Sequence, residues 1–212
     1  MSADFTKLLD GKRFILASSS PRRAEILRQA KVDFEVIFPE NIKESNISTD
    51  PVSHVLELSK RKTENVAKKV SEFVIKTQNR GSIGKDSLLL GADTIVVLNG
   101  EILGKPKDIE DAFRILKKLS GKEHKVYTGI TLLDKKNGKI LNGYQLTKVK
   151  FNQLKDEEIE KYIKSGEPLD KAGAYGIQGM GNFLVERIEG DLDNVIGLPL
   201  RKLKELLTKI RT

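Results

Sequence analysis

The chain has 212 residues, of which 38% are hydrophobic and 32% charged, and its formal net charge is +8. Such a chain can bury a core of its own, and it contains no apolar stretch of transmembrane or signal-peptide type, so we expect a soluble, cytoplasmic protein without membrane contact. The absence of cysteine excludes disulfides, zinc–thiolate sites and thiol catalysis. The positive charge fits an anionic small substrate, whereas nucleic acid is not favoured as a partner, because no basic run is interleaved with aromatic residues.

Hydrophobic periodicity and capping residues predict that strands and helices alternate in the first half of the chain. The expected elements are a strand over Arg13–Ala17, a helix over Pro21–Ala30, a half-buried strand over Asp33–Phe38, a polar loop over Glu40–Thr49 and a helix from Pro51 to about Lys76. The apolar run Leu88–Ala92 then predicts a central strand. Asp93 interrupts this run before Ile95–Leu98 resumes it.

Two Asn-Gly pairs, at residues 99–100 and 137–138, predict β-hairpins and therefore antiparallel pairing within a mixed sheet. The remaining expected elements are a strand over Glu101–Leu103, a helix between Asp108 and Gly121, strands over His124–Leu133 and Ile140–Phe151, a helix over Asp156–Ile163, a strand over Phe183–Ile188 and a helix over Leu198–Ile210. We find no repeat, linker or break in composition. The sequence therefore predicts one α/β domain over residues 1–212.

The start of the helix at Pro21 is the first candidate site. Ser20 is a suitable N-cap, and Arg22 and Arg23 follow it in the first turn. Two cations there are unfavourable for an isolated helix, because the unpaired N–H groups of the first turn already carry partial positive charge. Those N–H groups, the arginines and the hydroxyls of Ser18 and Ser20 could together hold a phosphate chain. The alternative is a surface helix with two solvated arginines.

Asp93 is the residue that we select first as catalytic. A carboxylate within an apolar strand is costly unless it is paired, hydrogen-bonded or bound to a metal. The alternative is a buried aspartate tied to a helix N-terminus or an arginine. With Glu44 of the polar loop, Asp93 would supply two oxygen ligands for Mg²⁺, which takes one or two carboxylates beside substrate phosphates and water. Spacing alone does not establish that pairing.

Two lysines and one glutamine complete the candidate set. Lys105 lies in a constrained turn just beyond the first hairpin, where a cation suits a phosphate or a developing negative charge, although a lone lysine in a turn is usually solvated. Lys62 is a similar candidate with a weaker case. Gln178 lies in the glycine-dense segment Asp170–Gly179, which could let the backbone approach a flat ligand. A plain turn around Tyr175 is the alternative there.

Several familiar site patterns are missing from the sequence. It contains no phosphate-binding G-x-x-x-x-G-K-[ST], no dinucleotide-binding G-x-G-x-x-G after a strand, no H-E-x-x-H and no G-x-S-x-G. His54 and His124 have no metal-ligand spacing, and we expect them to be structural or exposed.

The candidate residues other than Glu44 and Lys62 fall within motifs that are spread in order along nearly the whole chain. These are Leu16–Arg23, Gly91–Thr94, Lys105–Pro106, Ser120–Lys122 with His124, Thr128–Gly129, Asp170–Gly179 and Asn194–Leu200. Together they resemble the motifs of the Maf family of nucleoside triphosphate pyrophosphatases. Several ordered motifs are far more specific than any one of them.

The resemblance implies an elongated mixed sheet flanked by helices, with two lobes and a cleft between them, similar to the inosine triphosphate pyrophosphatase fold. It implies hydrolysis of a nucleoside triphosphate to the monophosphate and pyrophosphate with Mg²⁺ or Mn²⁺. Asp93 matches the proton acceptor and metal-associated aspartate, and Glu44 is the less secure match for a second metal ligand. The matching phosphate-binding residues are Arg22, Arg23, Lys62 and Lys105. The residues matching the branch that prefers dTTP and UTP are Arg23, Thr94 and Gln178.

Two other functions stay open at this point. One is the same reaction on 7-methyl-GTP or another non-canonical purine triphosphate. The other is a non-catalytic protein that binds nucleic acid or regulates division, although binding a phosphate backbone would not require Asp93. The resemblance also allows a homodimer, for which no stretch of the sequence argues on its own.

Overall fold

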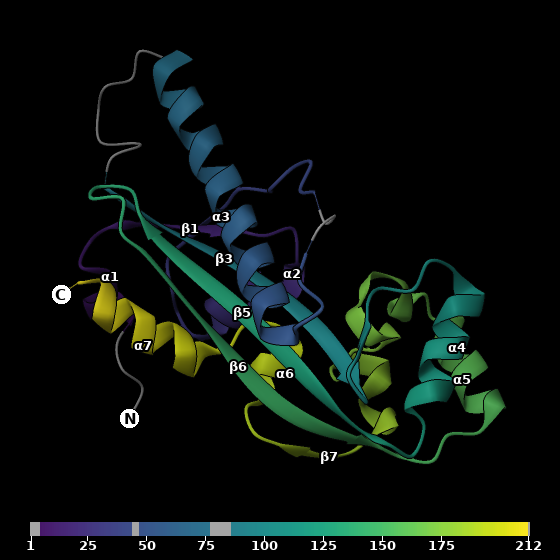
Figure 1. Cartoon of the computed structure of the whole chain (residues 1–212). Coiled ribbons are helices and arrows are strands. Elements are labelled where there is room, and N and C mark those ends of the chain that lie inside the picture. The colour runs from purple at the N-terminus through teal and green to yellow at the C-terminus, as the bar shows by residue number, and fades with distance from the viewer. Residues whose placement is uncertain (1–4, 44–46, 77–85, 212) are drawn as a thin grey trace. The chain divides into compact units, whose positions relative to one another are not determined.

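The structure is a computed structural model that describes residues 5–43, 47–76 and 86–211. Within these residues the chain forms a seven-stranded mixed sheet with helices beside it, in the strand order β2-β1-β3-β5-β6-β7, and β4 pairs with β3 (Figure 1). The strands are β1 (Arg13–Ala17), β2 (Glu35–Val36), β3 (Ser87–Leu98), β4 (Glu101–Leu103), β5 (Glu123–Asp134), β6 (Ile140–Phe151) and β7 (Val185–Glu189). The expected fold class, a mixed α/β sheet, is confirmed.

The sheet is mixed because its pairs run in both directions. β1 pairs in parallel with β2 and with β3, where Ile15 lies opposite Leu89. β4 pairs antiparallel with β3, and β7 pairs antiparallel with β6. Asn99 and Gly100 join β3 to β4 with positive φ angles of 52° and 85°, as the first predicted hairpin requires.

The helices that the structure describes are α1 (Phe5–Leu9), α2 (Pro21–Gln29), α3 (Pro51–Lys76), α4 (Ile109–Leu119), α5 (Asp156–Ile163), α6 (Leu192–Ile196) and α7 (Leu200–Ile210), with short 3₁₀ turns η1 (Glu167–Asp170), η2 (Ala172–Ala174) and η3 (Gly179–Leu184). None of these helices is long and apolar enough to cross a membrane.

The chain divides into two compact units, which are described separately. The first comprises residues 1–93, 129–144 and 197–212, and the second comprises residues 94–128 and 145–196. β3, β5 and β6 each contribute one part to each unit. A single domain over residues 1–212 stays a prediction.

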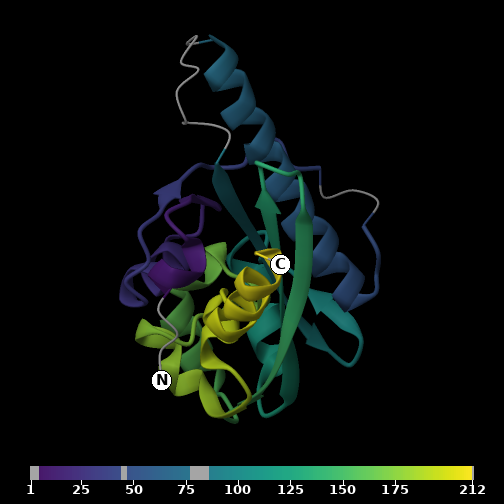
Figure 2. The ribbon, with the colours of Figure 1, turned by 90° about the vertical axis from the view of Figure 1, so that its left-hand side faces the viewer.

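In the first unit α3 and α7 lie on opposite faces of the sheet (Figure 2). The apolar face of α3 packs on β1 and β3 through a buried cluster formed by Ile15, Ala17, Val66, Val70 and Leu89. On the other face Leu206 of α7 contacts β6, and α1 packs along α7. Burial of these apolar side chains on both faces stabilises the sheet segment that carries β1 and the first half of β3.

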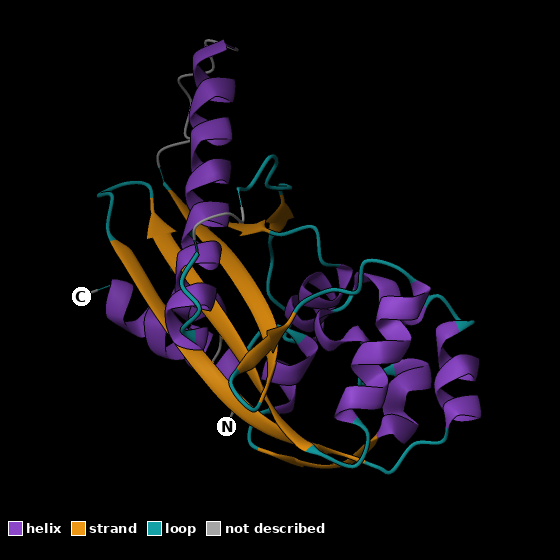
Figure 3. Cartoon of the chain, turned by 45° about the vertical axis from the view of Figure 1, so that its right-hand side comes forward, coloured by secondary structure: helices purple, strands orange, loops and turns teal. Residues whose placement is uncertain are grey.

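The second unit has its own apolar core, in which α4 and α5 lie side by side (Figure 3). The largest buried members of this core include Leu116, Leu119, Phe151 and Tyr162. Asp108 caps α4 as predicted, because its carboxylate accepts the N–H of Asp111 at 2.8 Å. The glycine-dense segment follows α5 as the 3₁₀ turns η1 to η3.

Several predicted elements need correction. The predicted strand Asp33–Phe38 is only two residues long, because only Glu35 and Val36 pair with β1 at the edge of the sheet. It is not half-buried, since Val36 is 39% and Phe38 58% exposed. β3 continues through Asp93 without interruption. The last strand and the last helix begin two residues later than predicted, and α1 and α6 were not predicted.

Candidate active site

Ser18, one of the two serines among the predicted site residues, holds the loop between β1 and α2. Ser20 occupies the N-cap position of α2 with an extended backbone, but its side chain makes no capping hydrogen bond. Instead Ser18 Oγ, which is buried, accepts hydrogen bonds from the Ser20 N–H at 3.1 Å and from Arg23 Nη1 at 3.2 Å. Ser18 therefore fixes both the loop and the buried arginine. The predicted N-cap position of Ser20 is confirmed, although its side chain does not make the capping hydrogen bond.

Arg23 is not a solvated surface residue. Its side chain points inward, where Nε donates to the Gly197 carbonyl at 2.8 Å and Nη1 donates to the Ala92 carbonyl at 2.9 Å. Burial lowers the pKa of Arg23 to about 10, and the nearby Asp93 carboxylate opposes that shift. The guanidinium thus stays cationic at neutral pH. Arg22, the next residue towards the N-terminus, is half-buried.

Asp93 lies in the middle of β3 and is 8% exposed. Its Oδ1 accepts a hydrogen bond from Lys62 Nζ at 2.5 Å, so the carboxylate has the partner that its burial requires. Arg23 adds a second positive charge to its surroundings. The first unit thus brings Ser18, Arg23, Lys62 and Asp93 together at the adjoining parts of β1, α2, α3 and β3.

Two glycines allow α3 to approach the sheet closely enough for Lys62 to reach Asp93. A Cβ atom at Gly91 would overlap Thr63 Oγ1 and lie 2.5 Å from the Ser59 carbonyl oxygen. A Cβ atom at Gly129 would lie 2.5 Å from the Val55 carbonyl carbon. Side chains at both positions would push the helix away from β3 and β5.

Hydroxyl groups fill the narrow space between α3 and β5. Ser59 Oγ and Thr131 Oγ1 form a hydrogen bond of 2.8 Å, and Thr63 Oγ1 donates to the Ser59 carbonyl at 2.8 Å. Ser59 and Thr63 were not among the predicted site residues. Their spacing could have indicated them, because they are small polar residues four positions apart on a helix face that also carries Val55 and Val66.

Three predicted site residues belong to the second unit. Thr94 directly follows Asp93 in β3, is half-buried, and forms a hydrogen bond of 2.9 Å with Thr128 through the two hydroxyls. Lys105 is exposed in the turn after β4, and this turn is tied to the glycine-dense segment because the Gly173 N–H donates to the Gly104 carbonyl at 2.9 Å. Gln178 is exposed at the start of η3.

His124 is a buried residue of the second unit, in agreement with a structural role. Its Nε2 forms a hydrogen bond of 2.8 Å with the Tyr175 hydroxyl, and its ring packs edge-on against Phe151. Burial lowers the pKa of His124 to about 4 and raises the pKa of Tyr175. His124 is therefore neutral at physiological pH. It anchors Tyr175, three residues before Gln178.

Asp93 is the predicted metal ligand that lies within the described residues. Glu44, the predicted second ligand, lies outside the described residues. Among the residues that the structure does describe, no cluster of three His, Asp or Glu side chains could hold a metal alone. Asp93 offers a carboxylate oxygen with cations beside it, which suits a metal carried mainly by substrate phosphates and water.

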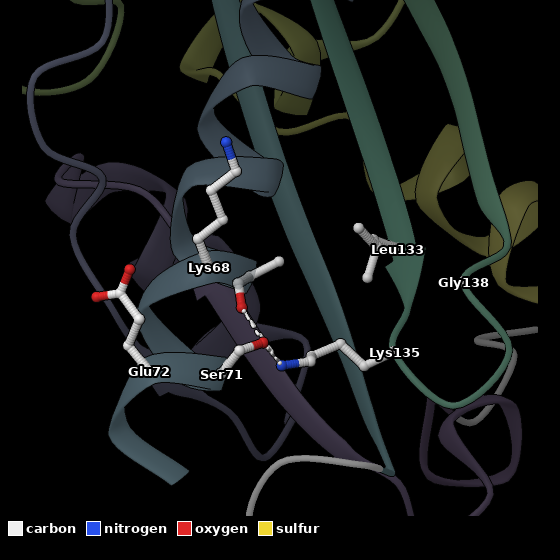
Figure 4. Close-up of a pocket in the computed structure, with 7 residues that line it drawn as sticks. Lys68, Ser71, Glu72, Leu133, Lys135 and Gly138 are labelled. Atoms are coloured by element: carbon white, nitrogen blue, oxygen red, sulfur yellow. Dashed lines mark hydrogen bonds between the residues drawn. The ribbon is translucent and has the colours of Figure 1, made fainter. Parts of the chain in front are cut away.

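A pocket of about 380 Å³ in the first unit contains none of the predicted site residues. It lies between α3 and the β5–β6 hairpin and is lined by Ala67, Lys68, Ser71, Glu72, Leu133, Lys135 and Gly138 (Figure 4). Lys135 Nζ donates to Ser71 Oγ at 2.7 Å and to the Ala67 carbonyl at 3.3 Å, so its ammonium group is already bound to α3. This pocket is separate from the Asp93 site.

Comparison with known proteins gives consistent results. The family model described as "Maf-like protein" matches residues 13–210. A protein of Caldicellulosiruptor saccharolyticus named dTTP/UTP pyrophosphatase is 45% identical over 201 residues, which is 94% of this chain and 95% of that protein. One of the same name from Ruminiclostridium cellulolyticum is 48% identical over 94% of this chain and 96% of its own length. The solved structure of the Staphylococcus aureus Ham1 protein shares the fold, with a TM-score of 0.50, 15% identity, and coverage of 93% of this chain and 99% of that one.

Proposed function

The chain belongs to the Maf family, and on that premise we propose that it hydrolyses nucleoside triphosphates, dTTP and UTP above all, to the monophosphate and pyrophosphate. The observation that carries the proposal is the buried Asp93 carboxylate, which has Lys62 bound to it and Arg23 beside it. When water attacks a phosphate ester or anhydride, a carboxylate must act on the water and fixed cations must offset the negative charge. The residues around Asp93 provide this arrangement.

In this reaction water attacks the α-phosphorus in line with the departing pyrophosphate, on which negative charge accumulates. Asp93 orients the attacking water and accepts its proton. Arg22, Lys62 and Lys105 hold the phosphate chain and offset the charge that builds up in the transition state. A divalent metal, Mg²⁺ or Mn²⁺, held by Asp93 and by Glu44, would supply further electrostatic stabilisation of the same charge.

Arg23 acts differently from its neighbour. Because its guanidinium already donates to the carbonyls of Gly197 and Ala92, it fixes the strand residue just before Asp93. Its charge also favours the ionised form of that carboxylate. Thr94 and Gln178 read the base, which accounts for a preference among nucleotides.

The experiment that tests the proposal measures pyrophosphate released from canonical, modified and 7-methylated triphosphates with Mg²⁺ or Mn²⁺. Asp93→Asn should lower the rate of dTTP and UTP turnover by at least about a thousandfold. The matched control is Asp134→Asn, because Asp134 is also a buried aspartate, paired with Lys12 at 2.7 Å. That control should keep the activity. Release confined to 7-methyl-GTP would contradict the pyrimidine preference, and no release at all would contradict the reaction.

A further inference from the structure

In the second unit one carboxylate holds the backbone on both sides of Gln178. Glu167 Oε2 accepts the backbone N–H of Met180 at 3.3 Å, and Glu167 Oε1 accepts the Tyr162 hydroxyl at 3.2 Å. The Tyr162 hydroxyl in turn accepts the backbone N–H of Gly176 at 3.0 Å. The residues two positions before and two positions after Gln178 are thus bound to the same side chain, one of them through a tyrosine hydroxyl.

The segment between these two anchors is closed on itself. A Cβ atom at Gly181 would lie 2.0 Å from the Gly176 carbonyl oxygen, so the backbone at the two ends of the segment is in direct contact. A Cβ atom at Gly176 would lie 2.8 Å from Glu167 Oε1, so a side chain there would displace the carboxylate. Gln178 is exposed between these contacts, and they determine where its backbone lies.

Glu167 is itself fixed in place. Its backbone N–H donates to Ser165 Oγ at 3.2 Å, and its carbonyl accepts Lys171 Nζ at 2.6 Å. Tyr162, through which it reaches Gly176, is a core residue that is 1% exposed. The carboxylate is therefore presented to the segment from a rigid base.

The arrangement needs both oxygens of a carboxylate. Each oxygen accepts one hydrogen bond, from Tyr162 at one and from Met180 at the other. A glutamine at position 167 would offer one acceptor oxygen and one NH₂ group, which is a donor. One of the two hydrogen bonds would then be lost, and the segment would be held on one side of Gln178 alone.

We propose that Glu167 is a positioning residue of the site, whose carboxylate fixes residues 176–180 and thereby holds Gln178 in place for the nucleotide. The proposal rests on the function proposed above, in which Gln178 contacts the base. Glu167 acts through Gln178 and touches no reacting atom. A segment that is already ordered loses little conformational freedom when a ligand binds, so removal of the carboxylate should weaken binding more than it slows the chemical step.

The test is a double-mutant cycle that combines Glu167→Gln with Gln178→Ala. Glu167→Gln alone should raise KM for UTP at least about fivefold and change kcat by less than about twofold. In the Gln178→Ala background the same substitution should change KM by less than about twofold, because the side chain that it positions is gone. A merely structural role would instead give equal effects in both backgrounds.

Two further variants support the cycle. Tyr162→Phe keeps the ring in the core and removes only the hydroxyl that joins Glu167 to Gly176, so it should also raise KM in the wild-type background alone. The matched control is Glu158→Gln, because Glu158 also accepts a backbone N–H, that of Lys155 at 2.8 Å, but does so at the start of α5. This control should leave KM unchanged.

Binding keeps this test distinct from the test of the reaction. Calorimetry with α,β-imido-UTP, which is not cleaved at the α-phosphorus, should give the same cycle in Kd. If the analogue binds but no triphosphate is hydrolysed, the proposed function fails and the cycle in Kd still decides the role of Glu167. The proposal is overturned if folded Glu167→Gln keeps the wild-type KM and Kd, if its effect is the same with and without Gln178, or if the wild-type protein does not bind the analogue.

Discussion

Lys62 Nζ lies 2.5 Å from Asp93 Oδ1, and the two side chains are only 17% and 11% exposed. An ion pair of this kind is costly to break from one side, because the remaining charge stays buried without its partner. Loss of either partner alone should therefore destabilise the fold, and the pair places a lysine beside the carboxylate.

Replacing Lys62 by methionine should lower kcat for UTP by at least about a hundredfold and destabilise the fold by about 2 kcal/mol. The matched control is Lys12→Met, which breaks the buried pair between Lys12 and Asp134 in the same unit. It should cost similar stability and leave kcat unchanged. Steady-state kinetics and urea unfolding check both effects, and equal losses of kcat in the two variants would contradict a specific role for Lys62.

α3 lies so close to β3 that no side chain should be tolerated at position 91. Gly91→Ala places a methyl group against Thr63 and the Ser59 backbone, so α3 must move and carry Lys62 with it. We expect a loss of about 3 kcal/mol and of most activity. Gly143→Ala is the control, because the atoms nearest to its Cβ would belong to the flexible Lys202 side chain, at 3.2 Å, and to Leu206, at 3.6 Å. Thermal unfolding of the two variants checks the difference.

Arg23 and Arg22 should respond differently to the same substitution. Arg23→Lys removes the fork of N–H donors that joins the carbonyls of Gly197 and Ala92, and lysine cannot reproduce that geometry. The expected cost is about 2 kcal/mol of stability together with a fall in kcat. Arg22→Lys should raise KM for the triphosphate and leave the unfolding free energy within about 0.5 kcal/mol of wild type. Similar unfolding curves for both variants would contradict the structural role of Arg23.

The buried imidazole of His124 should make stability depend on pH. Its folded-state pKa of about 4 lies below its ordinary value of 6.5, so the unfolded chain takes up a proton in this range before the folded protein does. The neutral imidazole therefore makes its full contribution to the free energy of unfolding above pH 6.5. As the pH falls towards 4, this contribution is lost at up to about 1.4 kcal/mol per pH unit. Urea unfolding at pH 7.5, 6 and 5 should show this slope in the wild-type protein.

His124→Gln should remove that part of the slope. Tyr175→Phe, in which the imidazole stays buried, should retain it. A slope that does not change in His124→Gln would show that other groups cause the pH dependence.

Local signals in the sequence predicted most of the regular structure. The Asn-Gly pair before β4 and Asp108 at the start of α4 act within a few residues of the chain, and both predictions are confirmed. The short β2 shows the limit of such signals. Its alternating pattern is that of a strand, but pairing and burial depend on what lies beside it.

The sequence could predict which residues belong to the candidate site, but not which of them contact one another. The cost of a carboxylate in an apolar strand pointed to Asp93 before any partner was known. The contact of Lys62 with Asp93 joins residues 31 positions apart, and that of Arg23 with Gly197 joins residues 174 apart. No spacing rule covers such distances. The closeness of α3 to the sheet needed the three-dimensional positions of Gly91 and Gly129.

The most direct test of the proposed reaction is hydrolysis of UTP and dTTP in ¹⁸O-labelled water, followed by mass spectrometry of the products. Attack on the α-phosphorus should place one ¹⁸O in the monophosphate and leave the pyrophosphate unlabelled, and Asp93→Asn should yield neither product. Label in pyrophosphate or in orthophosphate would mean that water attacks another phosphorus. That result would contradict the reaction proposed for this site.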